Sequence, residues 1–270
     1  MSNISEEKDS FSADIIRQSV RQHYGQIAAN NECGCGPSCC DDASSPNVIS
    51  ITMGYTTDEL NSVPSGANMG LGCGNPQAIA GLKKGETVVD LGSGGGFDCF
   101  LASTQVGHEG RVIGVDMTPE MIVKARTNAI NADYSNVEFR LGEIENLPVA
   151  DNTADCIISN CVINLSPDKR RVFQEAYRVL KPGGRLAISD VVAMAEMPLE
   201  MRSNQELLTG CVAGASYIAD LEDILESMGF QSIQIRPKSD SSAFMKEWIP
   251  GTNITDYVVS STIEAIKPMV

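Results

Sequence analysis

The stretch Asp90-Leu-Gly-Ser-Gly-Gly-Gly96 directly follows a short apolar run, Thr87–Leu91, and precedes a helical pattern. Its glycines let the backbone turn sharply and pass close to a ligand. The dinucleotide fingerprint requires glycine at the sixth position of G-x-G-x-x-G, and Phe97 occupies that position here. The loop therefore predicts a nucleotide-binding sheet whose ligand lacks a pyrophosphate.

Strand and helix patterns alternate regularly from this loop onward. The expected strands cover 87–91, 111–115, 137–141, 154–159 and 184–190, and the helices between them cover 97–106, 118–131 and 168–180. Alternation at this spacing implies right-handed crossovers and a doubly wound, mostly parallel α/β sheet. Beyond the fifth strand, we expect helices over 198–209 and 218–228, and two strands over 232–236 and 257–266 that close the sheet.

The chain divides into three parts in this interpretation. The N-terminal part, 1–74, combines an amphipathic helix over 12–29 with a cysteine-rich loop. Residues 75–195 form the nucleotide-binding domain. Residues 196–270 supply substrate-binding helices together with the closing strands of the sheet.

The composition restricts the kinds of partner. Lys and Arg number 20 against 35 Asp and Glu, so the formal net charge is −15. Such a balance repels phosphate backbones and anionic membrane surfaces, so we expect no nucleic-acid or membrane partner. The first residues lack a signal-peptide pattern, no apolar run reaches membrane-spanning length, and the nine cysteines are an odd number. These features predict reduced thiols in the cytoplasm.

Further candidate ligand residues follow the second and third strands. Asp116 ends the second strand, 20 residues beyond the last glycine of the loop, where a carboxylate can accept hydrogen bonds from ribose hydroxyls. Glu143 and Ile144 follow the third strand and are placed to line an adenine pocket, whereas Glu145 is expected to face solvent. In the competing interpretation Asp90 and Asp116 only cap turns. That interpretation can account for Asp116 alone but not for the ordered set of elements.

These features resemble the class I S-adenosylmethionine methyltransferases over about residues 75–190. The resemblance rests on Val88-Val-Asp-Leu-Gly-Ser-Gly-Gly-Gly96, Val115-Asp-Met117 and Leu180-Lys-Pro-Gly-Gly184. It implies a Rossmann-like fold, S-adenosylmethionine as cofactor, and residues 75–195 as the domain that binds it. The cofactor-binding residues that it implies are Asp90, Gly92, Gly94, Gly96, Asp116, Met117, Glu143, Ile144 and Asn160.

Three cysteines lie in short segments that are rich in glycine or asparagine and far apart in sequence. The segments are Gly72-Cys-Gly-Asn75, Ser159-Asn-Cys-Val-Ile-Asn164 and Gly210-Cys-Val-Ala-Gly214. Each lies where a loop would leave the sheet, so their thiols are expected to meet over the ligand site. A single buried cysteine is usually a small core residue, and this is the favoured interpretation for Cys99 and Cys156.

These segments resemble the arsenite methyltransferases, and the resemblance covers nearly the whole chain. Residues 256–268 are similar to the C-terminus of the short prokaryotic type. The resemblance implies methyl transfer from S-adenosylmethionine to trivalent arsenic, an arsenic-detoxification activity. The arsenic ligands and catalytic thiols would be Cys73, Cys161 and Cys211, with Cys39 or Cys40 as an auxiliary thiol. The implied partners are arsenite or its thiol conjugates and a thiol reductant, thioredoxin or a small thiol.

The residue types agree with this chemistry. Thiolates favour soft centres such as trivalent arsenic, whose lone pair can attack a sulfonium methyl group without a general base. Two other functions use the same features: a class I methyltransferase acting on a small organic acceptor, and a non-catalytic metalloid-binding protein. Cys33, Cys35, Cys39 and Cys40 could also close a tetrahedral zinc site, but their spacing departs from the usual pairs, which favours a metalloid-capturing thiol.

Overall fold

A computed structural model describes residues 3–30, 45–238, 241, 245–246 and 253–269. Cys33, Cys35, Cys39 and Cys40 lie outside these residues. The predictions of an auxiliary thiol at Cys39 or Cys40, and of a zinc site, therefore concern a part of the chain that is not described.

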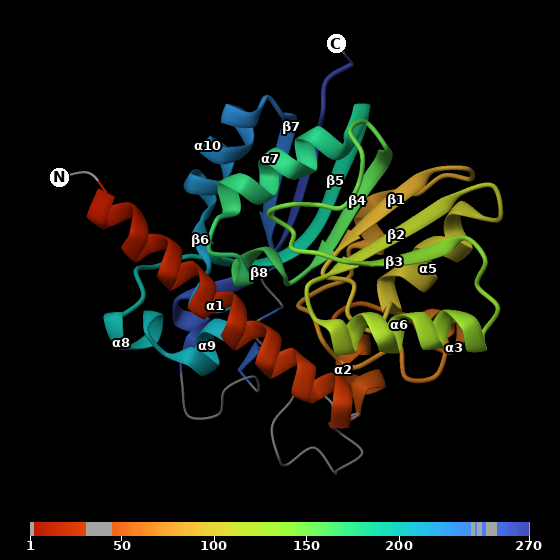
Figure 1. The fold of residues 1–270 in the computed structure, drawn as a ribbon, viewed down its shortest axis with the longest axis horizontal. Helices are drawn as coiled ribbons and strands as arrows, with labels where there is room; N and C mark the ends of the chain where they lie inside the picture. Colours follow the sequence, from red (N-terminus) through yellow and green to blue (C-terminus); the bar gives the residue numbers. More distant parts are fainter. Residues whose placement is uncertain (1–2, 31–44, 239–240, 242–244, 247–252, 270) are drawn as a thin grey trace.

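Eight strands form one mixed sheet, whose order from edge to edge is β3-β2-β1-β4-β5-β8-β7, with β6 paired to β5 (Figure 1). β1 to β6 pair in parallel, whereas β8 pairs antiparallel with both β5 and β7. The doubly wound, mostly parallel sheet and its two closing strands are therefore confirmed. The strands are β1 (Thr87–Leu91), β2 (Arg111–Asp116), β3 (Val137–Leu141), β4 (Ala154–Asn160), β5 (Leu180–Ala193), β6 (Ser216–Tyr217), β7 (Gln231–Pro237) and β8 (Val258–Ile266).

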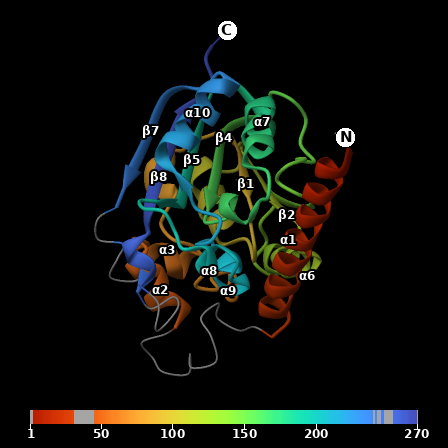
Figure 2. The same cartoon turned by 90° about the vertical axis from the view of Figure 1, so that its left-hand side faces the viewer.

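Helices cover both faces of the sheet (Figures 1 and 2). Val88 of β1 is buried in a core cluster with residues of α5 and α6, and Val89 is buried in another with residues of α7 and α10. Burial on both faces is expected of central parallel strands. The helices are α1 (Asn3–Asn30), α2 (Pro46–Thr52), α3 (Thr57–Ser62), α4 (Gln77–Ala80), α5 (Phe97–Val106), α6 (Pro119–Asn131), α7 (Lys169–Val179), α8 (Leu199–Arg202), α9 (Gln205–Thr209) and α10 (Ile218–Met228), with short 3-10 turns at Ile163–Leu165 and Ile254–Asp256.

The helix predicted over 198–209 is divided into α8 and α9. The division falls at Asn204, whose side chain accepts hydrogen bonds from the amides of Glu206 and Leu207 and so starts a new helix. The sequence patterns above do not predict α2 and α3. A signal for α3 was available, because Thr56 and Glu59 form a capping box at its first turn.

The long helix α1 lies across the molecule beside α6 and α9 (Figure 1). Arg21 pairs with Glu143 at 2.9 Å, and Arg17 pairs with Glu145 at 3.3 Å. Glu145 is only 7% exposed and also accepts a hydrogen bond from the Ser166 hydroxyl at 2.8 Å. The prediction that Glu145 faces solvent is wrong, because α1 and the Ser166 turn cover its carboxylate.

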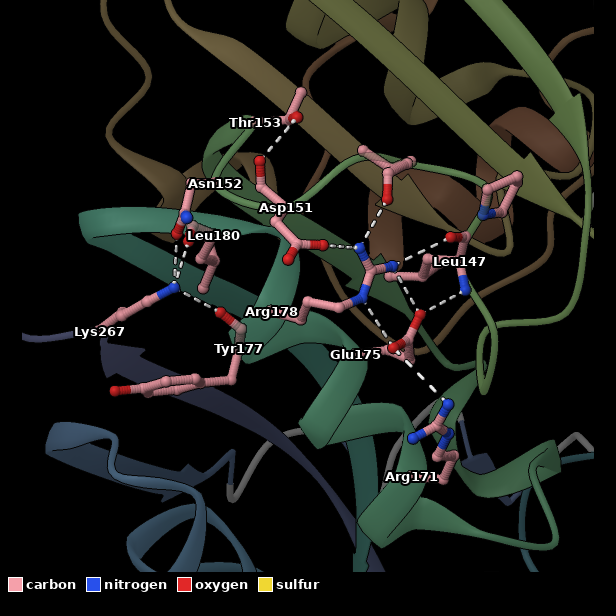
Figure 3. Close-up of polar contacts among 12 residues, drawn as sticks. Leu147, Asp151, Asn152, Thr153, Arg171, Glu175, Tyr177, Arg178, Leu180 and Lys267 are labelled. Atoms are coloured by element: carbon pink, nitrogen blue, oxygen red, sulfur yellow. Dashed lines mark hydrogen bonds and ion pairs between the residues drawn. The ribbon is translucent and has the colours of Figure 1, made fainter.

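A polar network fixes α7 against the segment that leads into β4 (Figure 3). Arg178 donates to the carboxylates of Glu175 at 2.7 Å and Asp151 at 2.6 Å. The Glu175 carboxylate, only 5% exposed, also accepts the backbone N–H of Leu147 at 2.8 Å. Lys267, which follows β8, donates to two backbone carbonyl oxygens at the end of the same helix. These contacts support β4 and β5, whose carboxyl ends bear the candidate site.

Candidate active site

The strand order reverses beside β1, which lies between β2 and β4. Ligands of such sheets bind outside the carboxyl ends of the strands at this point. The loop after β1 is pressed against the turn after β4, since a Cβ on Gly92 would lie 2.4 Å from the Val162 side chain. At Gly94, which has a φ of +51°, nothing lies within 4 Å of the place a Cβ would occupy. The loop therefore combines a close backbone contact at Gly92 with open space at Gly94.

Asp116, at the end of β2, supports this loop. Its Oδ2 accepts the backbone N–H of Gly94 at 2.9 Å, and its Oδ1 accepts that of Thr118 at 2.8 Å. Burial raises the pKa of the Asp116 carboxyl, and the two amide hydrogen bonds oppose that shift. A carboxylate oxygen can accept more than one hydrogen bond, so ribose hydroxyls can still bind there. The carboxylate and the open space at Gly94 therefore fit S-adenosylmethionine.

The other residues predicted to bind the cofactor have different surroundings. Met117 packs against the cluster that contains the three thiols, while Ile144 packs in the main core. Asp90 is 3% exposed and accepts a hydrogen bond from the Cys99 thiol at 3.2 Å. The Glu143 carboxylate is paired with α1. The roles of these residues in cofactor binding stay predictions.

The structure brings Cys73, Cys161 and Cys211 together. The sulfurs of Cys73 and Cys161 and a carboxylate oxygen of Asp190 all lie within 4.8 Å of one another. The Sγ of Cys211 donates to the carbonyl oxygen of Cys161 at 2.7 Å. All three thiols are buried and belong to one apolar cluster, while Cys99 and Cys156 are buried in a separate core cluster. The Cys73 and Cys161 sulfurs are therefore close enough to share one soft centre out of water, and the Cys211 thiol lies beside them.

Two of the thiols lie on strained turns. Cys161 follows β4 with a φ of 58°, and Cys211 follows α9 with a φ of 63°. This left-handed conformation costs a residue other than glycine about 1–3 kcal/mol and recurs at functional sites. Tight packing holds the two turns together: a Cβ on Gly214 would lie 2.1 Å from the carbonyl oxygen of Asn164. The close packing of Gly214 against Asn164 therefore holds the two turns, with Cys161 and Cys211, in their strained conformations.

The site keeps two of its thiols, those of Cys161 and Cys211, protonated. The pKa of Cys161 is raised well above its usual value. Hydrogen bonding to Cys211 and Cys73 is the larger cause, and burial raises it further. The hydrogen bond with Cys161 lowers the pKa of Cys211, but burial and the Asp190 carboxylate outweigh it, so this pKa is raised too. Burial also raises the pKa of Asp190 to about 6, against its hydrogen bond from the Val191 amide and the charge of Lys169. At neutral pH the thiols of Cys161 and Cys211 are therefore protonated, and the negative charge beside them is that of Asp190.

Two residues beside the thiols are missing from the sequence prediction. Asp190, at the carboxyl side of β5, accepts hydrogen bonds from the backbone N–H of Ile163 and the side chain of Asn164, which fixes the turn after Cys161. Its position as the last residue of the expected strand over 184–190 could have indicated it. Tyr24 of α1 packs against the thiol cluster and donates to the carbonyl oxygen of Thr209 at 3.0 Å. No local pattern predicts this contact, because 185 positions separate Tyr24 from its partner.

Comparison with known proteins agrees with this geometry. The family model described as a methyltransferase domain matches residues 82–229, more than half of the chain. The crystal structure of an arsenic(III) S-adenosylmethionine methyltransferase from Chlamydomonas reinhardtii superposes with a TM-score of 0.60 at 35% identity, covering 82% of this chain and 73% of that one. The chain belongs to the arsenite methyltransferase family. The predicted family and the class I S-adenosylmethionine methyltransferase fold are thereby confirmed.

Two curated members of this family are longer than the chain. The arsenite methyltransferase of Halobacterium salinarum is 51% identical over 93% of this chain and 66% of its own length. That of Aquipseudomonas alcaligenes is 39% identical over 80% of this chain and 62% of its own length. The chain thus spans less than two thirds of these relatives. Among the described residues, no helix combines the length and apolar character that a membrane crossing requires.

Proposed function

We propose that this chain transfers the methyl group of S-adenosylmethionine to trivalent arsenic held by Cys73, Cys161 and Cys211. The observation that carries the proposal is the gathering of three buried thiols, from three distant segments, in one cluster against which Met117 packs. The neighbouring residue, Asp116, supports the glycine loop. The names of the relatives, arsenite methyltransferases, support the same substrate.

Binding of arsenic by these thiols needs no external base. Each thiol replaces one hydroxide ligand of arsenous acid, and its proton leaves with that hydroxide as water. Protonated thiols of raised pKa, as at Cys161 and Cys211, are therefore suited to the neutral trihydroxide. Apolar neighbours of the thiols, among them Val191 and Leu207, keep water from the bound arsenic.

Methyl transfer then depends on position. S-adenosylmethionine would supply an electrophilic methyl group, so that an arsenic–carbon bond forms from the arsenic lone pair as the sulfur–carbon bond breaks to give S-adenosylhomocysteine. Asp116 and the loop at Gly94 would hold S-adenosylmethionine, and the thiols would hold arsenic. Orientation of this kind supplies up to ~7–11 kcal/mol in favourable reactions.

A thiol reductant is part of the proposal. Forming the arsenic–carbon bond from the lone pair raises the formal oxidation state of arsenic from three to five. A further round needs two electrons, which thioredoxin or a small thiol would supply by forming a disulfide. The auxiliary thiol predicted at Cys39 or Cys40 and a location in the reducing cytoplasm are proposed on the same chemistry.

One assay tests the function. The full chain is incubated with arsenite, S-adenosylmethionine and a small thiol, and the arsenic species and S-adenosylhomocysteine are both quantified. Methylated arsenicals matched by S-adenosylhomocysteine are expected. Arsenite binding without S-adenosylhomocysteine would instead indicate a metalloid-binding protein. Turnover of members of a panel of small organic acceptors, with arsenite left unmethylated, would indicate the other methyltransferase function.

A further inference from the structure

The backbone of Cys73 is held from both sides by side chains of two different strands. The Cys73 N–H donates to the Oδ1 of Asn160 at 2.9 Å, and the Ser260 hydroxyl donates to the Cys73 carbonyl oxygen at 2.6 Å. Asn160 is the last residue of β4, and Ser260 is a fully buried residue of β8. Both peptide groups of Cys73 thus have a side-chain partner from the sheet.

The glycines on either side of Cys73 are explained by close contacts with β4 and β5. A Cβ on Gly72 would lie 2.7 Å from the amide of Asn160, and one on Gly74 would lie 2.9 Å from the Ser189 hydroxyl oxygen. The Asn160 amide also donates to the Gly74 carbonyl oxygen at 2.8 Å. Gly-Cys-Gly is therefore the sequence that lets the segment lie directly on the ends of β4 and β5.

Asn160 is itself fixed by a buried chain of hydrogen bonds. Its Nδ2 donates to the hydroxyl oxygen of Tyr55 at 3.0 Å, and that hydroxyl donates to a carboxylate oxygen of Asp98 at 2.8 Å. An asparagine amide has two N–H donors and one carbonyl acceptor, and those of Asn160 are engaged within the protein. Its side chain therefore acts on the Cys73 segment, although the sequence assigns Asn160 to the cofactor.

Cys73 depends on side-chain hydrogen bonds to its backbone more than Cys161 does. Cys161 directly follows β4, whose pairing with β1 and β5 places it. Cys73 lies in the connection between α3 and α4, where no strand pairing fixes the backbone. The hydrogen bonds that its backbone makes with Asn160 and Ser260 tie it to the sheet.

We propose that Asn160 and Ser260 are positioning residues that fix the Cys73 thiol opposite Cys161 and so complete the three-thiol arsenic site. This inference rests on the proposed function, because it assigns these residues to the same site. Neither residue touches arsenic or the methyl group in this role. Their effect on arsenic passes through Cys73 alone.

A double-mutant cycle tests this dependence, with arsenite as the probe and equilibrium dialysis of the full chain without cofactor as the measurement. Asn160→Ala and Ser260→Ala should each raise the Kd for arsenite about tenfold, because that factor corresponds to the loss of one or two hydrogen bonds. In the Cys73→Ser background the same substitutions should change Kd less than about twofold. Equal effects in both backgrounds, or none in the wild type, overturn the proposal.

Ser261→Ala is the matched control. Ser261 is also fully buried on β8 and donates to a backbone carbonyl oxygen, but that of Asp190. Its removal should leave the arsenite Kd within about twofold, because the lost hydrogen bond ends on the backbone of Asp190 and not on the Cys73 segment. A Ser261→Ala effect as large as that of Ser260→Ala would point to general loosening of the sheet.

Thiol alkylation followed by mass spectrometry provides a readout that needs no arsenic. Cys73 is fully buried, so iodoacetamide reaches it only when the segment opens. Asn160→Ala and Ser260→Ala should speed alkylation of Cys73 about tenfold while Cys156 keeps its rate. Equal acceleration at both thiols contradicts the proposal. If wild-type protein binds no arsenite, the proposed function fails, while the alkylation result still decides the positioning role.

Discussion

The Sγ of Cys211 lies 2.7 Å from the carbonyl oxygen of Cys161, although 50 positions separate the two residues. The contact joins the turn after α9 to the carboxyl end of β4. Both residues have positive φ angles, so each turn holds a conformation that its own sequence disfavours. The thiol cluster is thus a product of packing between segments, and its parts can be removed separately.

Cys211→Ala should lower kcat/KM for arsenite methylation by about a hundredfold or more, because arsenic loses one ligand and its alignment with the methyl group. The affinity for S-adenosylhomocysteine, measured by calorimetry, should stay within about twofold. Cys156→Ala is the matched control, since Cys156 is equally buried but lies within β4, in a separate core cluster. Full activity of the Cys211 variant would remove the basis for the assigned ligands.

Asp116→Ala should raise the Kd for S-adenosylhomocysteine at least about tenfold, because the ribose acceptor and the support of Gly94 are lost together. Binding can be followed by calorimetry without arsenic. Glu222→Gln, which changes an exposed carboxylate on α10, should leave this Kd unchanged. An unchanged Kd in Asp116→Ala would favour the interpretation that Asp116 only caps a turn.

Arg178→Ala should lower the free energy of unfolding by about 2 kcal/mol, because the buried carboxylate of Glu175 loses its closer cation and keeps only Arg171, at 3.9 Å. Urea denaturation of both proteins at neutral pH measures the difference. Arg170→Ala is the control on the same helix: Arg170 is exposed and donates to the Ser227 hydroxyl. A loss in Arg178→Ala no larger than in this control would show that the network in Figure 3 adds little stability.

Stability should fall as pH rises from 5 to 7. Burial raises the pKa of Asp98 to about 6, against hydrogen bonds from Tyr55 and Asn160, and that of Asp190 also to about 6. In the unfolded chain both carboxyls titrate near 3.8, so in this window the folded protein binds more protons than the unfolded one. Each group should therefore remove about 1 kcal/mol of stability between pH 5 and 7.

Urea denaturation at several pH values checks this slope. Asp98→Asn keeps the side-chain shape and an acceptor oxygen for Tyr55 but removes the titration, so its slope should be smaller. Asp58→Asn, at an exposed position of α3, should keep the wild-type slope. Stability that rises between pH 5 and 7 would contradict the burial of these two carboxyls in their acidic forms.

The sequence patterns predicted the sheet closely where local signals agree. β1 and α5 have the predicted bounds, because a run of apolar β-branched residues, a glycine turn and a helical pattern follow one another without conflict. Prediction failed at Asn204, where a side chain caps a new helix inside an otherwise helical stretch. It failed also at Glu145, whose burial depends on an arginine of α1 that lies 128 positions away.

Some features of the candidate site were likewise predictable from local sequence, and others were not. Glycine loops, strand ends and cysteine segments are local features, and the order of residues along the chain was sufficient to predict a cofactor loop and to select Cys73, Cys161 and Cys211 as candidate ligands, which the structure places in one cluster. The contacts of Tyr24, Asp190 and Ser260 were not accessible from sequence, because each joins segments that meet only after the sheet has formed. Backbone patterns are set by neighbours in sequence, whereas thiol separation, burial and pKa are set by neighbours in space. Only the tertiary structure could decide which side chains hold each thiol in place.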